Sequence, residues 1–200
     1  MSSLVNADEI DFDAILSALL KLPPPLLPPG KASEPKLTDQ ISSLYVHPCL
    51  EAALHILNSD LPSAHFLCRH MQAKPQYEGM FLHGILHRVE GDYDNARAWY
   101  RDVSATDVFN HVWPKPKEAF EFIDQVETFK GSRSDMNSRK RKLEQTSVAE
   151  ITGVIRFCVD KFGTKKIQDA TKYWQQPDGE LSELGKDMVT GSKGFRRFEG

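Results

Sequence analysis

The feature that most constrains the fold is a 22-residue stretch, 82–103, with the sequence LHGILHRVEGDYDNARAWYRDV. Four apolar residues recur in it with the spacing of one helix face: Leu82, Ile85, Leu86 and Val89. Gly91 can take the left-handed conformation that ends a helix, and Asp92 can cap the next helix. The stretch therefore predicts two antiparallel helices joined by a tight turn.

This pattern resembles one tetratricopeptide unit. The matching residues are a small one in the first helix, Gly-Asp-Tyr at the turn, and a small residue followed by an aromatic one in the second helix: Gly84, Gly91, Asp92, Tyr93, Ala96 and Tyr100. His83 and His87 stand where that family has large residues, and the proline expected near position 108 is absent. The resemblance implies a helical hairpin.

A second copy of the hairpin precedes the first, at 50–71. Six of 22 aligned positions are identical: Leu50/Leu82, Leu54/Leu86, His55/His87, Asp60/Asp92, Ala64/Ala96 and Arg69/Arg101. The offset of 32 residues is close to the period of about 34 residues in such helix pairs. Two units cannot bury both faces of a stack, so we expect the remaining helices to cover its ends.

The same region, roughly 48–110, resembles a family of uncharacterised helical proteins from fungi and bacteria. Its core pattern is matched here by His83, His87, Arg88, Glu90, Gly91, Asp92, Tyr93, Asn95, Ala96 and Trp99. The resemblance implies a helical fold and carries no activity with it.

Composition narrows the class of protein. The net charge of −3 gives no bulk electrostatic case for nucleic acid or membrane as a partner. Three scattered cysteines without a C-x-x-C pair favour reduced thiols inside a cell. No apolar run approaches the roughly 20 residues that span a bilayer. We expect a cytoplasmic protein of unknown oligomeric state whose partner is a protein or a small acidic ligand.

The predicted class is all-α: stacked antiparallel hairpins with an N-terminal helix and a C-terminal helical cap. The predicted parts are an N-terminal helix and proline-rich linker at 1–37, the hairpin core at 38–129, a basic mobile linker at 130–146, and C-terminal helices with a loose tail at 147–200.

Individual elements are predicted along these parts. The first helix is expected from Asn6 to Leu22, where Asn6 and Glu9 have capping-box spacing, and 104–115 is expected to be irregular. The proline run PPPLLPP predicts a stiff spacer, with recognition by an SH3-type domain as the alternative. The basic run Arg139–Lys142 is expected in a mobile loop, with nuclear import as the alternative.

Two C-terminal helices are predicted from their caps. Ser147 and Glu150 have capping-box spacing and predict a helix start at Ser147, with its end at Gly163. Thr164 is expected to cap another helix, which would carry Ile167, Ala170 and Trp174. A last short helix is expected at Leu181–Val189.

The residues with the clearest chemistry are His83, His87 and Glu90, spaced so that they share one side of a helix. Two imidazoles and a carboxylate could share a metal ion, and His65 on the other hairpin could add a further ligand. Without a metal, one histidine could act as a general base. The zinc-protease motif is absent because Gly84 stands where its glutamate would be.

A structural role for both histidines is favoured over these alternatives, because they occupy packing positions and the second one recurs as His55. A second group, His65, Cys68 and His70, is expected to be packing rather than metal binding, since Cys68 falls on the apolar stripe. No metal site and no cofactor are therefore predicted.

The first functional hypothesis is a non-enzymatic interaction protein with a partner in the groove between the hairpins. The residues expected to bind it are Arg88, Asp92, Trp99 and Arg101. The alternative is a small accessory enzyme of a biosynthetic pathway, using His83, His87 and Glu90. Phosphate-binding loops, nucleotide fingerprints and serine-hydrolase elbows are absent from the sequence.

Overall fold

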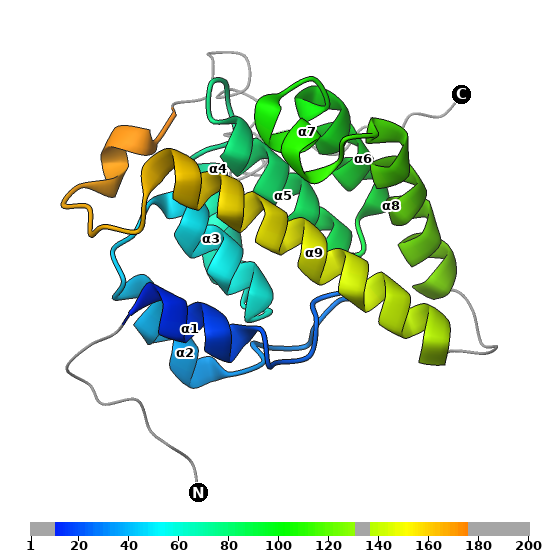
Figure 1. Ribbon diagram of the computed structural model, residues 1–200, viewed down its shortest axis with the longest axis horizontal. Helices are drawn as coiled ribbons and strands as arrows, with labels where there is room; N and C mark the ends of the chain where they lie inside the picture. Colours follow the sequence, from blue (N-terminus) through cyan, green and yellow to red (C-terminus); the bar gives the residue numbers. More distant parts are fainter. Residues whose placement is uncertain (1–10, 131–136, 176–200) are drawn as a thin grey trace, which may run out of the picture.

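The computed structural model describes residues 11–130 and 137–175, and all regular structure in these ranges is helical (Figure 1). The predicted all-α class is confirmed. The elements are α1 Phe12–Leu19, α2 Pro35–Ser42, α3 Pro48–Leu57, α4 Leu61–Arg69, α5 Tyr77–Glu90, α6 Tyr93–Val103, α7 Asp107–Val112, α8 Pro116–Lys130, α9 Asn137–Phe162 and a final 3-10 turn, Ala170–Tyr173. None of the described helices is both long and apolar enough to cross a membrane.

Both predicted hairpins are present, α3 with α4 and α5 with α6, and α4 packs against α5. Their turns share one geometry. Ser59 and Gly91 occupy equivalent positions and both have left-handed backbone, with φ of 57° and 83°. The next residue, Asp60 or Asp92, donates its N–H to the carbonyl of His55 or His87 at 2.9 Å in each case. The two segments therefore fold in the same way locally, although Ser59 lacks the conformational freedom of glycine.

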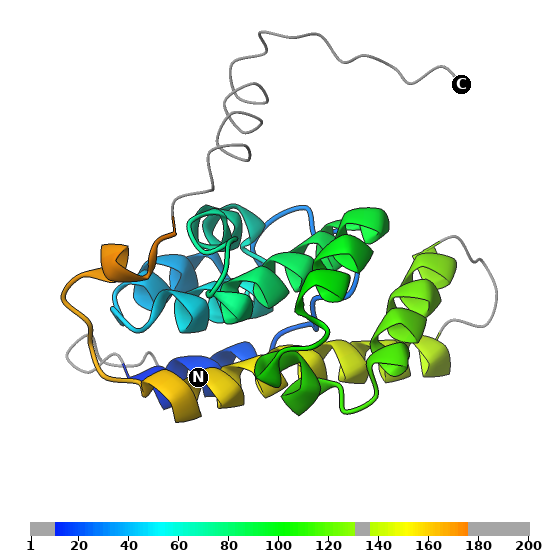
Figure 2. The same cartoon turned by 90° about the horizontal axis from the view of Figure 1, so that it is seen from above.

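Helix α9 covers the face that the two hairpins share. It packs against α3, α5 and α7 and crosses them obliquely (Figure 1). Figure 2 shows the hairpins in one layer and α1 with α9 in a second. The buried side chains of α9 are Leu143, Ser147, Glu150, Ile151, Val154, Ile155 and Cys158. The first helices of the hairpins, α3 and α5, thus have a helix of the same chain where the sequence placed an open groove.

The prediction of a mobile linker at 130–146 is wrong for residues 137–146, which form the first turns of α9. Lysine, arginine, glutamate and glutamine have good helix propensity, so a polar run need not be a loop. Lys140 and Glu144 form an ion pair one turn apart, and Leu143 is buried. All four residues of Arg139–Lys142 are exposed on this helix, and a role in nuclear import stays a prediction.

Other element boundaries agree only in part with those predicted. Residues 104–115 contain helix α7. Helix α1 begins at Phe12 because Asp11 has extended backbone, and the expected capping pair lies outside the described residues. Helix α9 does end before Gly163, which has φ of 70°. After it, the expected helix from Thr164 is reduced to the 3-10 turn, and the expected helix at Leu181–Val189 lies outside the described residues.

The proline-rich segment packs on the core rather than spanning open space. The side chain of Leu26 is buried, and the carbonyl of Pro25 accepts a hydrogen bond from the Ser147 hydroxyl at 2.7 Å. The segment that follows α1 is therefore attached to α9 by this hydrogen bond.

Candidate functional site

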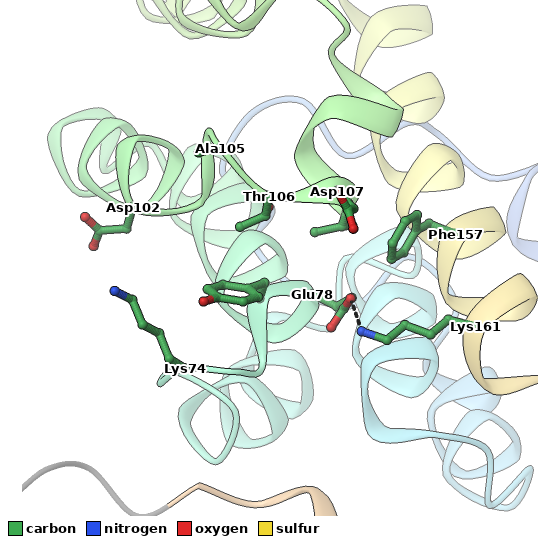
Figure 3. A pocket seen from close by; sticks show the side chains of 10 residues that line it. Lys74, Glu78, Asp102, Ala105, Thr106, Asp107, Phe157 and Lys161 are labelled. Carbon is green, nitrogen blue, oxygen red and sulfur yellow. Dashed lines mark hydrogen bonds and ion pairs between the residues drawn. The ribbon is translucent and has the colours of Figure 1, made fainter.

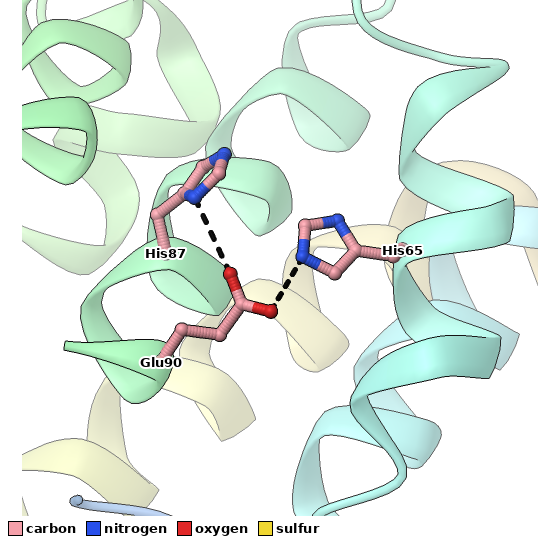
Figure 4. Close-up of side chains that lie close together, drawn as sticks. All are labelled: His65, His87 and Glu90. Atoms are coloured by element: carbon pink, nitrogen blue, oxygen red, sulfur yellow. Dashed lines mark hydrogen bonds and ion pairs between the residues drawn. The ribbon is translucent and has the colours of Figure 1, made fainter. Parts of the chain in front are cut away.

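Four side chains converge where α4 meets α5. Helix α4 supplies His65, and α5 supplies His83, His87 and Glu90. The Glu90 carboxylate lies between two imidazoles (Figure 4): Oε1 is 2.7 Å from His65 Nε2, and Oε2 is 3.4 Å from His87 Nδ1. The sequence placed His83, His87 and Glu90 on one side of a helix and named His65 as a neighbour, and the structure brings all four together.

His83 lies at the side of this cluster. Its ring stacks against the His87 ring, with centroids 4.8 Å apart, and against the Trp99 ring, with centroids 4.7 Å apart. The residue is only 5% exposed. His83 thus packs the cluster against α6 while the other three side chains direct their polar atoms toward one another.

Burial and neighbouring charges fix the protonation of two members. Burial would raise the pKa of Glu90, but the hydrogen bond from His65 and the nearby imidazole of His87 outweigh it and lower the pKa to about 2. Burial lowers the pKa of His83 to about 3, and repulsion from the imidazoles of His87 and His65 adds to the effect. At neutral pH Glu90 is therefore ionised and His83 is neutral.

The low pKa of His83 predicts that acid destabilises the fold. Below pH 6.5 the unfolded chain takes up a proton at this residue that the folded chain refuses until about pH 3, so the free energy of unfolding falls across that window. Replacing His83 by glutamine is expected to reduce the loss between pH 7 and pH 5 by about 1–2 kcal/mol. Urea denaturation at both pH values measures this. The control replaces the exposed His111 by glutamine and should keep the wild-type pH dependence. An equal fall in the free energy of unfolding for His83→Gln and the wild type would contradict the prediction.

The donor set of the cluster fits a metal ion. Ligand atoms of His65, His87 and Glu90 all lie within 4.8 Å of one another, and the three side chains are partly exposed. Zinc bonds of about 2.0–2.1 Å place tetrahedral ligand atoms roughly 3.4 Å apart. The 2.7 Å contact between His65 and Glu90 would have to widen by roughly 0.7 Å, which side-chain rotation can supply. His65 Nδ1 and His87 Nδ1 are buried without a hydrogen bond among the described residues.

Repetition accounts for only part of this cluster. In the first hairpin His55 Nδ1 lies 3.1 Å from Asp60 Oδ2, and in the second His87 Nδ1 lies 3.7 Å from Asp92 Oδ2. The His–Asp pair thus belongs to both turns. Glu90, however, has Asn58 as its counterpart in the first hairpin, so the carboxylate that joins the imidazoles is peculiar to the second.

Arg88, expected to bind a partner, is instead 0% exposed. Its Nη2 and Nε donate to Glu150 Oε2 at 2.8 and 3.2 Å, and Nη2 also donates to the Ser147 hydroxyl at 3.0 Å. The other oxygen of Glu150 accepts from the Tyr100 hydroxyl at 2.7 Å and from Trp113 Nε1 at 2.9 Å. The counter-ion of Arg88 is therefore the chain's own carboxylate, and its guanidinium is not accessible to a ligand.

The other expected binding residues do not join Arg88. Asp92 and Arg101 are exposed on α6 and its cap, and Trp99 is half-buried against His83. Sequence reasoning missed the partners of Arg88 because Ser147 and Glu150, three residues apart, were interpreted as a helix cap. The same spacing places both on one helix face, which was the available signal.

The second histidine group is divided: among the described residues His65 lies in the cluster with His87 and Glu90, and not in one with Cys68 and His70. Cys68 is fully buried in the core. His70 turns away from it, since its Nδ1 contacts the Phe66 carbonyl at 2.7 Å and its ring lies 4.1 Å from the Trp174 ring.

Comparison of the chain with protein-family models, with curated proteins and with solved structures found no match in any of the three.

Proposed function

We propose that this protein binds a divalent first-row metal ion, zinc by donor type, through His65, His87 and Glu90. The observation that carries the proposal is the convergence of these three ligand atoms from two helices on a partly exposed spot. Three protein ligands leave a coordination position for water, as in catalytic rather than structural zinc sites. The arrangement is consistent with the enzymatic alternative, in which the bound ion would activate water.

Protonation argues against His83 and Glu90 as general bases. A general base works best with a pKa near the operating pH. The pKa values of about 3 for His83 and about 2 for Glu90 make both groups weak bases at neutral pH. A carboxylate that stays ionised is, by contrast, what a metal ligand requires.

Partner binding ranks second because of where α9 lies. The interaction hypothesis placed the partner in the groove between the hairpins, with Arg88 as one contact. Helix α9 packs against α3 and α5, the first helices of the two hairpins, and Arg88 is buried against Glu150. A protein partner would have to bind without Arg88, and the interaction hypothesis stays a prediction.

The proposal is tested by metal binding to tag-free protein. Titration calorimetry with Zn²⁺ is expected to give one equivalent, and Co²⁺ is expected to give the visible absorption of a low-coordinate site. Each of the variants His65→Ala, His87→Ala and Glu90→Gln removes one ligand. The metal affinity should fall by more than the roughly 10–100-fold typical of changes to residues that only support a ligand.

The controls are His70→Ala and His111→Ala, which remove histidines that lie outside the cluster. Both are expected to keep the wild-type affinity. Circular dichroism confirms that each variant is folded. The proposal would be contradicted if the wild-type protein bound neither ion, or if the ligand variants changed only the melting temperature. The histidines would then have a structural role.

A further inference from the structure

A pocket separate from the histidine cluster lies where α5, α6, α7 and α9 meet (Figure 3). Its volume is about 580 Å³, within the range of small-molecule sites. The charged and aromatic side chains that line it include Lys74, Glu78, Asp102, Asp107, Phe157 and Lys161. The residues that line it come from segments far apart in the sequence, so no local sequence motif predicts the pocket.

Glu78 is the member that needs explanation. Its side chain is only 3% exposed, and Oε1 accepts an ion-pair hydrogen bond from Lys161 Nζ at 2.7 Å (Figure 3). The other oxygen, Oε2, is buried and has no hydrogen-bond partner among the described residues. A buried carboxylate oxygen without a donor is costly, and such groups in native proteins have a cause.

The charge of the pocket indicates what kind of donor fits. Three carboxylates, from Glu78, Asp102 and Asp107, face two ammonium groups, from Lys74 and Lys161. Lys161 is already paired with Glu78, which leaves two acidic groups and one basic group. The surplus is negative, so a cationic donor is favoured over an anion.

We propose that this pocket binds a small primary aliphatic amine whose ammonium group donates a hydrogen bond to Glu78 Oε2. The alkyl part of the ligand lies against Phe157, and Asp107 adds a second negative charge near the ammonium. A charge-assisted hydrogen bond to a buried carboxylate is among the strong polar contacts in proteins. The inference is independent of the metal site, which shares no residue with the pocket.

The test compares cations that differ in their N–H groups. Amide chemical shifts of isotopically labelled protein are followed during titration with n-butylamine, 1,4-diaminobutane and tetramethylammonium. We expect the two amines to change the amide chemical shifts of residues around Glu78 and Phe157, and these changes should saturate as the amine concentration rises. Tetramethylammonium, which has the charge but no N–H donor, is expected to bind at least about tenfold more weakly, because it leaves Oε2 unpaired.

Variants locate the binding. Glu78→Gln removes the charge and keeps the shape, and it is expected to lower amine affinity by about tenfold. Asp107→Asn leaves the core intact and is expected to lower affinity less, while Glu118→Gln on the exposed side of α8 should change nothing. Equal affinity for tetramethylammonium and n-butylamine, or shifts confined to other surfaces, would overturn the proposal. So would the absence of amine binding to the wild type, which needs no variant to interpret.

Discussion

Replacing Arg88 by methionine is expected to lower the free energy of unfolding by about 3–5 kcal/mol. The pair of Arg88 and Glu150 has side chains that are 0% exposed on both sides. Removing the guanidinium leaves the Glu150 carboxylate in the core without a counter-ion. This unpaired charge lowers the stability of the fold by more than the intact ion pair adds to it. Urea denaturation of the variant and the wild type measures the difference.

A double variant separates the buried charge from the loss of packing. Arg88→Met combined with Glu150→Leu removes both charges and is expected to recover only part of the loss, because Tyr100 and Trp113 then lose the acceptor for their donors. The control is Arg97→Met, which breaks ion pairs with the exposed Asp124 and Glu127 and should cost under about 1 kcal/mol. An Arg88→Met variant as stable as this control would mean that Glu150 tolerates the loss of its counter-ion inside the core.

Replacing Gly84 by valine is expected to destabilise the fold by about 3 kcal/mol. A Cβ at this position would lie 2.9 Å from Trp99 Cβ and 2.9 Å from Tyr100 Cδ1. Both contacts are with groups held close to the α6 backbone, so α5 and α6 would have to separate. Thermal and urea denaturation are the measurements, with circular dichroism to show that the helices persist.

The control for Gly84 is another helical glycine, Gly153. A Cβ there would lie 3.1 Å from Val112 Cγ2, the end of a side chain that can turn away. Alanine is favoured over glycine in a helix by about 1 kcal/mol, and this gain in stability offsets the crowding against Val112. Gly153→Ala should therefore leave the free energy of unfolding nearly unchanged. A Gly84→Val variant as mild as Gly153→Ala would mean that α5 and α6 do not need their close approach.

The hairpins could be predicted from the sequence because their signals are local. The apolar stripe, the turn at Gly91 and the cap at Asp92 lie within a few residues of one another. The role of Arg88 could not be predicted from the sequence, because its partner Glu150 is 62 residues away and on a different helix. A single sequence carries no record of such a contact, so an exposed position and a role in binding were expected for this charged residue.

The histidine cluster falls between these cases. The spacing of His83, His87 and Glu90 placed them on one side of α5, but only the packing of α4 against α5 decides whether His65 reaches Glu90. Spacing also cannot distinguish His83, which stacks on Trp99, from His87, whose Nδ1 faces the carboxylate. The pocket around Glu78 gave no signal at all, because its charged residues come from five different segments.

The late position of α9 has a consequence for biosynthesis. Ribosomes add about 5–20 residues per second, so roughly 3–12 seconds separate the translation of Arg88 from that of Glu150. Once α6 has been translated, and before α9 follows, the nascent polypeptide holds two hairpins with an uncovered apolar side and an arginine without its counter-ion. Transcripts that end before codon 137 would leave this state permanent, and their products would be substrates for chaperones and proteases.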